Sequence, residues 1–389
     1  MTSLRDLFLL DPNVVFLNHG SFGATPQPVF AAYQQWQRRL EAQPVQFLVA
    51  DLPELFAEAR RALALYLGTE ADNLVYVPNA TFGVNVIARS LKLQPGDEIL
   101  TSDHEYGACD NAWTFMCRQT GAVYRRQPIL LPVTAVADIV EQLWQGVTPR
   151  TKVIYLSHIT SPTALCLPVE AICDRAREAG ILTVIDGAHA PGQIELDLPA
   201  IGADFYTGNC HKWLMSPKGA AFLYARSEMQ HLVEPLVVGW GWGEGRTFTY
   251  GADFIDFQQW LGTHDPSAAL AVPAALEFMS NYNWPEVRQR CHELTALTMQ
   301  RVCALTGLPP ITPSSQDFFM QMAAIPLPAV DDLRLKRCLL EEFGVEVPIV
   351  AWNGRFFIRV SIQGYNTEAD VDRLLAALAE LLPEMMRDA

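Results

Sequence analysis

Short apolar runs rich in β-branched residues alternate with amphipathic helical patterns between residues 65 and 225, and few folds are compatible with this order. Apolar residues recur at three-and-four spacing in each helical pattern, and Gly180 follows the last of them. Strands that alternate with helices predict an α/β domain with a mostly parallel sheet between helices. The apolar runs are 74–78, 97–102, 152–158 and 181–186, and the helical patterns are 82–93, 136–147 and 169–180.

A second unit is predicted after the α/β domain, because a chain of 389 residues exceeds what one ordinary core supports. The order of patterns is helix, strand, helix, two strands and helix, which indicates a compact α+β domain. We therefore predict a large domain over 26–265 and a small C-terminal domain over 266–389. The patterns are 267–279, 285–305, 321–327, 330–344, 345–352, 356–362 and 367–382.

The charge balance of the chain limits the classes of partner that we expect it to bind. Lys and Arg number 28 against 43 Asp and Glu, a formal charge of −15, which repels nucleic-acid backbones and anionic membranes. No stretch is long enough to span a bilayer, and Asp6 and Asp11 interrupt the apolar residues of the N-terminus before a signal-peptide core forms. The eight cysteines are scattered without a CxxC pair, which is typical of reduced thiols in the cytoplasm.

Asp186 and Lys212 carry the strongest chemical signal. Asp186 ends the run 181–186, and Lys212 follows the next apolar stretch between His211 and Trp213, whose rings desolvate its amine and lower its pKa. Pyridoxal phosphate needs this pair: a lysine forms a Schiff base with its aldehyde, and a carboxylate keeps its pyridine nitrogen protonated. His189, three residues after Asp186, is predicted to bind the phenolic oxygen of this cofactor.

Other strand ends are also rich in polar residues, and open α/β sheets bind ligands there. In 78–85, free backbone N–H groups at Ala80 and Thr81 predict a phosphate site at a helix N-terminus, although a simple N-cap explains the pattern too. In 101–113, His104 or Tyr106 can lie against a pyridine ring, with a polar loop capped by Asp103 as the alternative. A polar wall is predicted after the third run, from Ser157, His158, Thr160, Ser161 and Thr163.

The segment 235–251 is rich in tryptophan and glycine. It is compatible with an exposed loop that faces a ligand or a partner, and also with an ordinary surface loop.

Four motifs together resemble a known family. They read NHGSFG (18–23), DHEY (103–106), SPTAL (161–165) and GNCHKW (208–213). The chain is similar over nearly its whole length to the class V branch of fold-type I pyridoxal-phosphate enzymes, and most of all to its isopenicillin N epimerase-like members. The branch also contains cysteine desulfurases, lyases and aminotransferases.

The resemblance implies a role for each matching residue. Lys212 is the Schiff-base lysine, Asp186 the partner of the pyridine nitrogen and His189 the donor to the phenolic oxygen. Arg359 holds the substrate α-carboxylate through a bidentate pair, in a pocket to which Asn18, His19 and Ser161 contribute. The segment 1–25 is thereby expected to reach both the active site and the small domain.

The same resemblance implies the phosphate site and the assembly. Ala80, Thr81 and His211 hold the phosphate, with Asn209 or Thr207 in the place of a serine. His104 is the ring-stacking residue, or Tyr106 if the loop is offset. A homodimer with shared active sites is implied, in which Thr263 completes the phosphate site of the partner subunit.

One departure from the family bears on the reaction. Desulfurases need a cysteine in the loop before the carboxylate-binding arginine, but 346–357 contains none, and Cys338 lies upstream in a helical pattern. Desulfuration is therefore disfavoured. After loss of the α-proton, three outcomes remain open, namely epimerisation, C–S lysis and transamination, and His104 and Tyr106 are the candidates for a second acid.

The sequence disfavours two other classes of protein. A non-catalytic binding protein with this fold is disfavoured by the joint presence of Lys212, Asp186, His189 and Arg359. A metal-dependent hydrolase is disfavoured as well, because its candidate ligands lack the tight helical spacing that zinc sites commonly use; these are His104, Asp186, His189 and His211. We expect no metal and a small amino-acid substrate.

Overall fold

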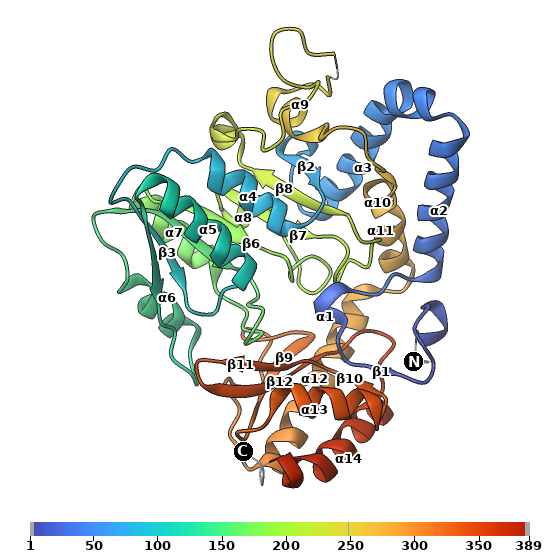
Figure 1. Cartoon of the computed structure of the whole chain (residues 1–389), viewed down its shortest axis with the longest axis vertical. Coiled ribbons are helices and arrows are strands. Elements are labelled where there is room, and N and C mark those ends of the chain that lie inside the picture. Colours follow the sequence, from blue (N-terminus) through green and yellow to red (C-terminus); the bar gives the residue numbers. More distant parts are fainter. Residues whose placement is uncertain (1–3, 248, 386–389) are drawn as a thin grey trace.

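A seven-stranded sheet forms the centre of the computed structural model, which describes residues 4–247 and 249–385 (Figure 1). Phe248, in the aromatic segment noted above, lies outside the described residues. The strand order is β2-β8-β7-β6-β5-β3-β4; β3 to β7 run parallel, and β8 is antiparallel to both of its neighbours. The predicted α/β fold with a mostly parallel sheet is thus confirmed. The strands are β2 (Leu74–Val77), β3 (Glu98–Ser102), β4 (Val123–Gln127), β5 (Thr151–Ser157), β6 (Leu182–Asp186), β7 (Phe205–Asn209) and β8 (Ala221–Ala225).

Helices cover both faces of this sheet. Along β2, Val75 and Val77 belong to one apolar cluster, with α4 and α5, while Leu74 and Tyr76 belong to the other, with α3 and α7. Because both faces are buried there, strands such as β2 and β8 are apolar throughout, and each large apolar side chain contributes about 1.5–3 kcal/mol on burial. The helices of this part are α1 (His19–Phe22), α2 (Gln27–Ala42), α3 (Leu52–Tyr66), α4 (Ala80–Ser90), α5 (Gly107–Thr120), α6 (Val136–Trp144), α7 (Val169–Glu178), α8 (Leu198–Ile201), α9 (Asp253–Gln259), α10 (Ser267–Leu270) and α11 (Val272–Asn281). The short 3₁₀ helices are η1 (Arg5–Leu7), η3 (Ala71–Asn73) and η4 (Ser227–Leu232), and η2 (Gln46–Asp51) is a π-helix.

Local signals explain which elements the sequence predicts. The helix after 169 ends as predicted, because Gly180 adopts the left-handed conformation (φ 68°) that glycine tolerates best. The edge strand β4 was missed, because its residues include Arg125 and Arg126 and are only partly buried, so that it lacks an apolar run.

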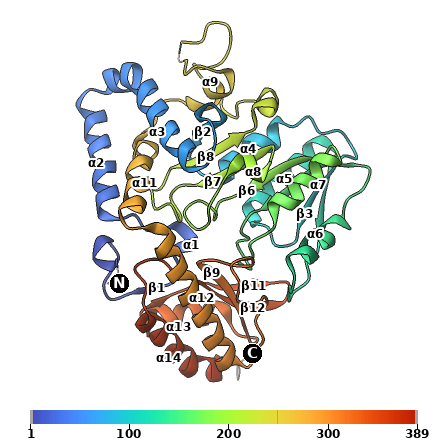
Figure 2. The same ribbon diagram turned by 180° about the vertical axis from the view of Figure 1, so that it is seen from behind.

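The C-terminal elements form a second unit, below the large sheet in Figure 1. Its three-stranded antiparallel sheet has the order β11-β12-β9 and is covered by long helices, of which α12 crosses in front of it in Figure 2. Strand β1 (Val15–Phe16) pairs with β10 of this unit, so this part of the N-terminal segment reaches it. The elements are α12 (Trp284–Thr306), β9 (Met322–Leu327), α13 (Asp332–Glu341), β10 (Val345–Glu346), β11 (Ile349–Trp352), β12 (Arg355–Ser361) and α14 (Glu368–Met385).

Packing suggests where the two units divide. The helices α10 and α11 pack against α2 and α3, whereas α12 packs against β9 and α14. The sequence places the boundary at 265/266, and we propose that it falls between α11 and α12. The large unit means the elements up to α11, and the small unit means the elements from α12 onward. Strand β1 pairs with the small unit but is not counted in it.

Within the described residues, none of the helices is both long and apolar enough to cross a membrane.

Candidate active site

A cavity of about 560 Å³ opens where β2, β5, β6 and β7 end. These four carboxyl ends lie at one edge of the sheet, as expected for a ligand site in an open α/β fold. The wall is formed by Ser21, Phe22, Pro78, Asn79, Ala80, Thr81, Tyr106, Ser157, Ile159, Ser161, Asp186, Ala188, His189, Asn209, His211, Lys212, Lys218 and Gly219.

Lys212 lies in this wall beside His189. Its Nζ is 3.1 Å from His189 Nε2, and burial lowers the pKa of the amine to about 8, against the opposing effect of Asp186. Trp213 Nε1 donates to His189 Nδ1 at 3.3 Å. Burial, followed by the charge of Lys212, holds the pKa of His189 well below its usual value, so the ring is neutral. Since Nδ1 accepts, we assign the proton of His189 to Nε2, on the cavity side.

Asp186 is buried at the end of β6. Its Oδ1 accepts from Ala188 N at 2.9 Å, and its Oδ2 is 3.4 Å from Tyr155 Oη and 3.5 Å from Cys109 Sγ. Burial raises its pKa, so a cationic N–H placed against Oδ2 would be strongly favoured. Neither Tyr155 nor Cys109 was predicted, because residues on other elements that hold a carboxylate from behind leave no local pattern.

The N-terminus of α4 forms another part of the wall. Ala80 N donates to Asn209 Oδ1 at 2.9 Å, and Phe82 N donates to the N-cap Asn79 at 2.9 Å. The expectation of a free N–H at Ala80 is therefore wrong, while Thr81 N has no hydrogen-bond partner within the described residues. Of the two alternatives Asn209 and Thr207, only Asn209 lines the cavity. Thr207 Oγ1 donates to Phe222 O, and Thr207 packs so closely on Gly83 that a Cβ there would lie 2.3 Å from its hydroxyl.

Two further basic side chains line the cavity. The ring of His211 contacts Ala220 O through Nδ1 at 3.2 Å, and burial lowers its pKa to about 4. Lys218 Nζ donates to Gly23 O at 3.0 Å. Lys218 was not predicted, because a lysine in a glycine-flanked loop ordinarily indicates a solvated surface.

Arg359, on β12 of the small unit, does not itself line the cavity but hydrogen-bonds to Ser161 and Ser21, which do. Its Nη1 donates to Ser161 O at 2.5 Å and to Ser161 Oγ at 3.1 Å, and its Nη2 donates to Ser21 Oγ at 3.2 Å. The side chain is buried, which lowers its pKa to about 10, and its Nε is buried without a partner. No carboxylate of the described residues pairs with it. A buried guanidinium without such a partner favours the binding of an external anion.

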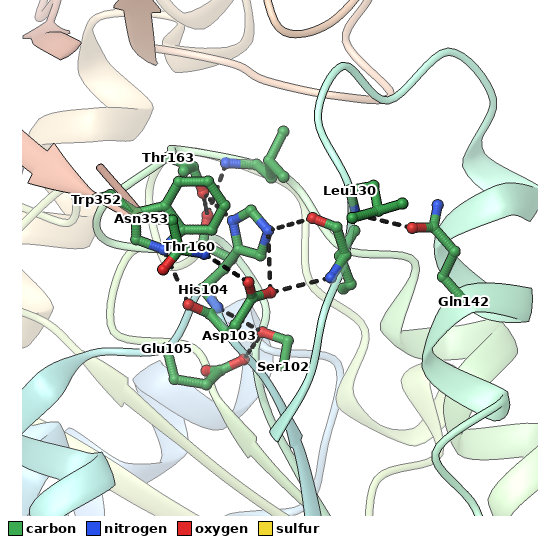
Figure 3. A network of polar contacts seen from close by, with 12 residues as sticks. Ser102, Asp103, His104, Glu105, Leu130, Gln142, Thr160, Thr163, Trp352 and Asn353 are labelled. Carbon is green, nitrogen blue, oxygen red and sulfur yellow. Dashed lines mark hydrogen bonds and ion pairs between the residues drawn. The ribbon is translucent and has the colours of Figure 1, made fainter. Parts of the chain in front are cut away.

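The two ring-stacking candidates after β3, His104 and Tyr106, occupy different environments in the structure. Tyr106 lines the cavity, whereas His104 does not. His104 is completely buried, with Nδ1 2.7 Å from Thr163 Oγ1 and Nε2 2.8 Å from Ile129 O, and its ring packs on Trp352 of the small unit (Figure 3). Of the two candidates we therefore propose Tyr106 for the place against the pyridine ring, because it lines the cavity and His104 does not.

The predicted polar wall after β5 is only partly formed. Ser157 and Ser161 line the cavity. His158 instead contacts Tyr206 Oη at 2.9 Å, and Thr160 and Thr163 contact each other at 2.8 Å. These three side chains are buried and support the loop from behind.

Asn18 and His19 do not line the cavity, although the sequence places them near the substrate. His19 is buried, with Nε2 3.1 Å from Lys212 O and Nδ1 3.0 Å from Tyr365 Oη. Asn18 Nδ2 donates to Glu346 Oε1 at 3.2 Å, and its Oδ1 accepts from Ser21 Oγ. Both residues support wall residues from behind, and Ser21 and Phe22 enter the wall in their place.

Thr263 and the aromatic segment lie outside this cavity. Thr263 is exposed, and the side chains of Trp240 and Trp242 are 62% and 53% exposed. The chain between η4 and α9 projects from the large unit on the side away from the small unit (Figures 1 and 2).

Among the described residues, no three His, Cys, Asp or Glu side chains are arranged to hold a metal ion. In particular, His104 is enclosed by Thr163, Ile129 and Trp352, away from His189 and His211.

The donor set fits pyridoxal phosphate. A lysine amine of lowered pKa and a buried carboxylate line one cavity with a neutral histidine that carries a proton toward it. The free N–H of Thr81 at the start of α4 and the ring of His211 suit a phosphate.

Comparisons with known proteins agree with this site. The family model "Aminotransferase class-V" matches residues 15–374. The isopenicillin N epimerase of Amycolatopsis lactamdurans is 38% identical, over 97% of each chain, and a probable chloroplastic L-cysteine desulfhydrase of Arabidopsis thaliana is 27% identical, over 96% of this chain and 84% of the relative. The crystal structure of the cysteine desulfurase CsdA from Escherichia coli superposes with a TM-score of 0.81 at 25% identity, over 98% of each chain. The chain therefore belongs to the aminotransferase class-V family of fold-type I pyridoxal-phosphate enzymes, as its sequence motifs predict.

Proposed function

We propose that the protein acts at the α-carbon of an amino acid, with Lys212 removing the α-proton, in a reaction like that of isopenicillin N epimerase. The main support is the position of Lys212, whose amine lies 3.1 Å from His189 with a pKa of about 8 and so accepts a proton near neutral pH. Pyridoxal phosphate, when bound, supplies the electron sink that stabilises the charge left on the α-carbon.

The other wall residues receive roles from their contacts. We propose that Asp186 holds the pyridine nitrogen, that His189 donates to the phenolic oxygen and that Thr81 and His211 bind the phosphate. Asn209 orients α4 through Ala80. Arg359, with its unpaired Nε, binds the α-carboxylate of the substrate.

Epimerisation also requires an acid that returns a proton on the opposite side of the α-carbon. We assign this role to Tyr106, because it lines the cavity whereas His104 is enclosed. Loss of the Tyr106 hydroxyl should therefore slow epimerisation more than it slows proton removal by Lys212.

C–S lysis is the second candidate, supported by the 27% identity to a probable L-cysteine desulfhydrase. Desulfuration is disfavoured, since no cysteine is among the described residues that line the cavity. The nearest upstream cysteine, Cys338, lies in α13 with a raised pKa, caused first by its hydrogen bond with Glu342. Transamination remains the alternative that the sequence left open.

A panel of amino acids in deuterated water tests these proposals. The purified protein should be yellow, and borohydride should abolish the colour and fix the cofactor to the peptide that contains Lys212. Racemisation, pyruvate release or keto-acid formation then identifies the reaction. A protein that exchanges no α-proton with any of these substrates, while it holds the cofactor on Lys212, would contradict the proposed role of the lysine.

We also propose that the protein is a cytoplasmic homodimer with shared active sites. All eight cysteines are free, which suits a reducing compartment. Thr263 is exposed outside its own cavity, and Val238, Trp240 and Trp242, which precede α9, are exposed apolar residues close together in the sequence. Exposed apolar groups of this kind mark protein interfaces.

A further inference from the structure

The tip of the β11–β12 hairpin in the small unit rests on the large unit at Asp103 and His104. Trp352 Nε1 donates to Asp103 O at 2.9 Å, and Asn353 Nδ2 donates to Asp103 Oδ2 at 2.8 Å. The indole of Trp352 lies on the imidazole of His104, with ring centroids 4.2 Å apart and planes inclined by 33°. Figure 3 shows these groups converging between the two units.

The large-unit side of this contact is itself firmly held. Asp103 Oδ1 accepts from Ile129 N at 3.0 Å, so both carboxylate oxygens have partners. His104 bridges Ile129 O and Thr163 Oγ1, and burial lowers its pKa. The hairpin thus meets a platform whose polar groups are already fixed by the fold.

The same hairpin carries Arg359. Strand β12 pairs with β11 from Trp352 opposite Arg355 to Ile349 opposite Ile358, and Arg359 N continues the ladder by donating to Pro348 O at 3.0 Å. The turn between the strands has a left-handed backbone at Asn353 (φ 46°) and Gly354 (φ 72°). The hairpin tip and Arg359 therefore belong to one short hydrogen-bonded ladder.

The arginine rests on the same part of the large unit. Its guanidinium contacts Ser161, which lies between Thr160 and Thr163, and these two threonines contact each other and, through Thr163, His104. Two points of the hairpin, the tip and Arg359, are thus anchored on one connected network of the large unit.

We propose that Asp103, Trp352 and Asn353 are positioning residues that fix Arg359 relative to Lys212, and thereby set the selectivity of the site for substrates with an α-carboxylate. This inference rests on the proposed function of Arg359. A bidentate guanidinium is sensitive to small displacements, because both of its hydrogen bonds depend on orientation. Loosening the tip should weaken the binding of an amino acid without weakening that of an amine that lacks the carboxylate.

The test compares the binding of glycine and of methylamine to the holoenzyme. Binding is measured by the change in the visible absorption of the bound cofactor. The two probes share an amine and differ in the carboxylate. The dissociation constant of methylamine divided by that of glycine therefore measures the contribution of Arg359 to binding. Asn353→Asp should reduce this ratio by about tenfold, because it places a carboxylate against Asp103 while aspartate still tolerates the left-handed backbone. Asp103→Asn with Asn353→Asp exchanges donor and acceptor, and the double variant should recover most of the ratio.

Asn283→Asp is the matched control. Asn283 also has a left-handed backbone (φ 48°) and donates through Nδ2, to Glu286 at 3.0 Å, at the start of α12 away from the hairpin tip. An unchanged ratio in Asn353→Asp, an equal loss in Asn283→Asp, or no recovery in the double variant would each overturn the proposed pairing. A wild-type holoenzyme that binds the cofactor but does not prefer glycine over methylamine would overturn the role of Arg359 itself.

Discussion

The chemistry of each residue in the cavity depends on what surrounds it. Lys212 and Lys218 both line the wall, but only the amine of Lys212 lies beside the imidazole of His189, whose pKa is held well below its usual value by burial and by the charge of Lys212. Lys218 is tied to a backbone carbonyl. The two lysines therefore differ in what holds their amines, a histidine ring in one case and a backbone carbonyl in the other.

The pKa of Lys212 gives a prediction at this scale. In the cofactor-free protein, its reaction with a neutral arylating reagent such as dinitrofluorobenzene should rise with pH to a midpoint near 8, because burial disfavours the ammonium form. An exposed lysine has its midpoint at about 10.4. Asp186→Asn should move the midpoint to lower pH, since the carboxylate of Asp186 favours the ammonium. Peptide mapping resolves Lys212 from the other lysines, and a midpoint near 10 would contradict the prediction.

The arrangement of groups in the cavity also depends on the orientation of whole helices and strands. The helix α4 begins at the cavity with Ala80 held by Asn209 of β7 and Phe82 held by Asn79, which leaves the N–H of Thr81 as its free donor. Close packing at Gly83 against Thr207 brings the helix near the strand. In the small unit, the segment in which desulfurases need a mobile cysteine forms instead the paired strands β11 and β12.

The variant Asn209→Ala tests whether Asn209 orients the N-terminus of α4. Without the side-chain acceptor, Ala80 N loses its partner, and we expect the dissociation constant of pyridoxal phosphate to rise roughly fivefold, or about 1 kcal/mol. Equilibrium dialysis measures it. The control is Asp331→Ala, which removes the N-cap acceptor of Arg334 N at the start of α13. It should cost about 1 kcal/mol of unfolding free energy and leave cofactor affinity unchanged. Equal affinity losses in both variants would indicate a general loss of stability.

The molecule as a whole brings distant segments to one site. Ser21 comes from the N-terminal segment, the lysine from the large unit and Arg359 from the small unit, and they meet within hydrogen-bonding contact of the same wall. Thr263 and the exposed tryptophans of the large unit remain outside it. In the proposed dimer these groups belong to the interface and to the site of the partner subunit.

Subunit complementation tests the shared site. Lys212→Ala and Thr263→Ala should each lower activity as homodimers, whereas a mixture refolded together forms hybrids in which one of the two sites is intact. Equal mixing should therefore restore about one quarter of wild-type activity, by random assortment of the subunits. Sedimentation checks that dimers form. A mixture with only the mean of the two variant activities would show that Thr263 serves no second subunit.

The sequence by itself determined the α/β architecture, four strands of the large sheet and the pair Asp186 and Lys212. These follow from local causes, namely side-chain periodicity and the position of a residue directly after a buried strand. Only the tertiary structure decided which residue of the DHEY motif faces the cavity, because His104 is covered by Trp352, which is distant in sequence. It likewise placed His19 behind Lys212 and turned Ala80 N toward Asn209. The direction of a side chain in a loop is set by what packs on it from elsewhere in the chain, and no local pattern carries that information.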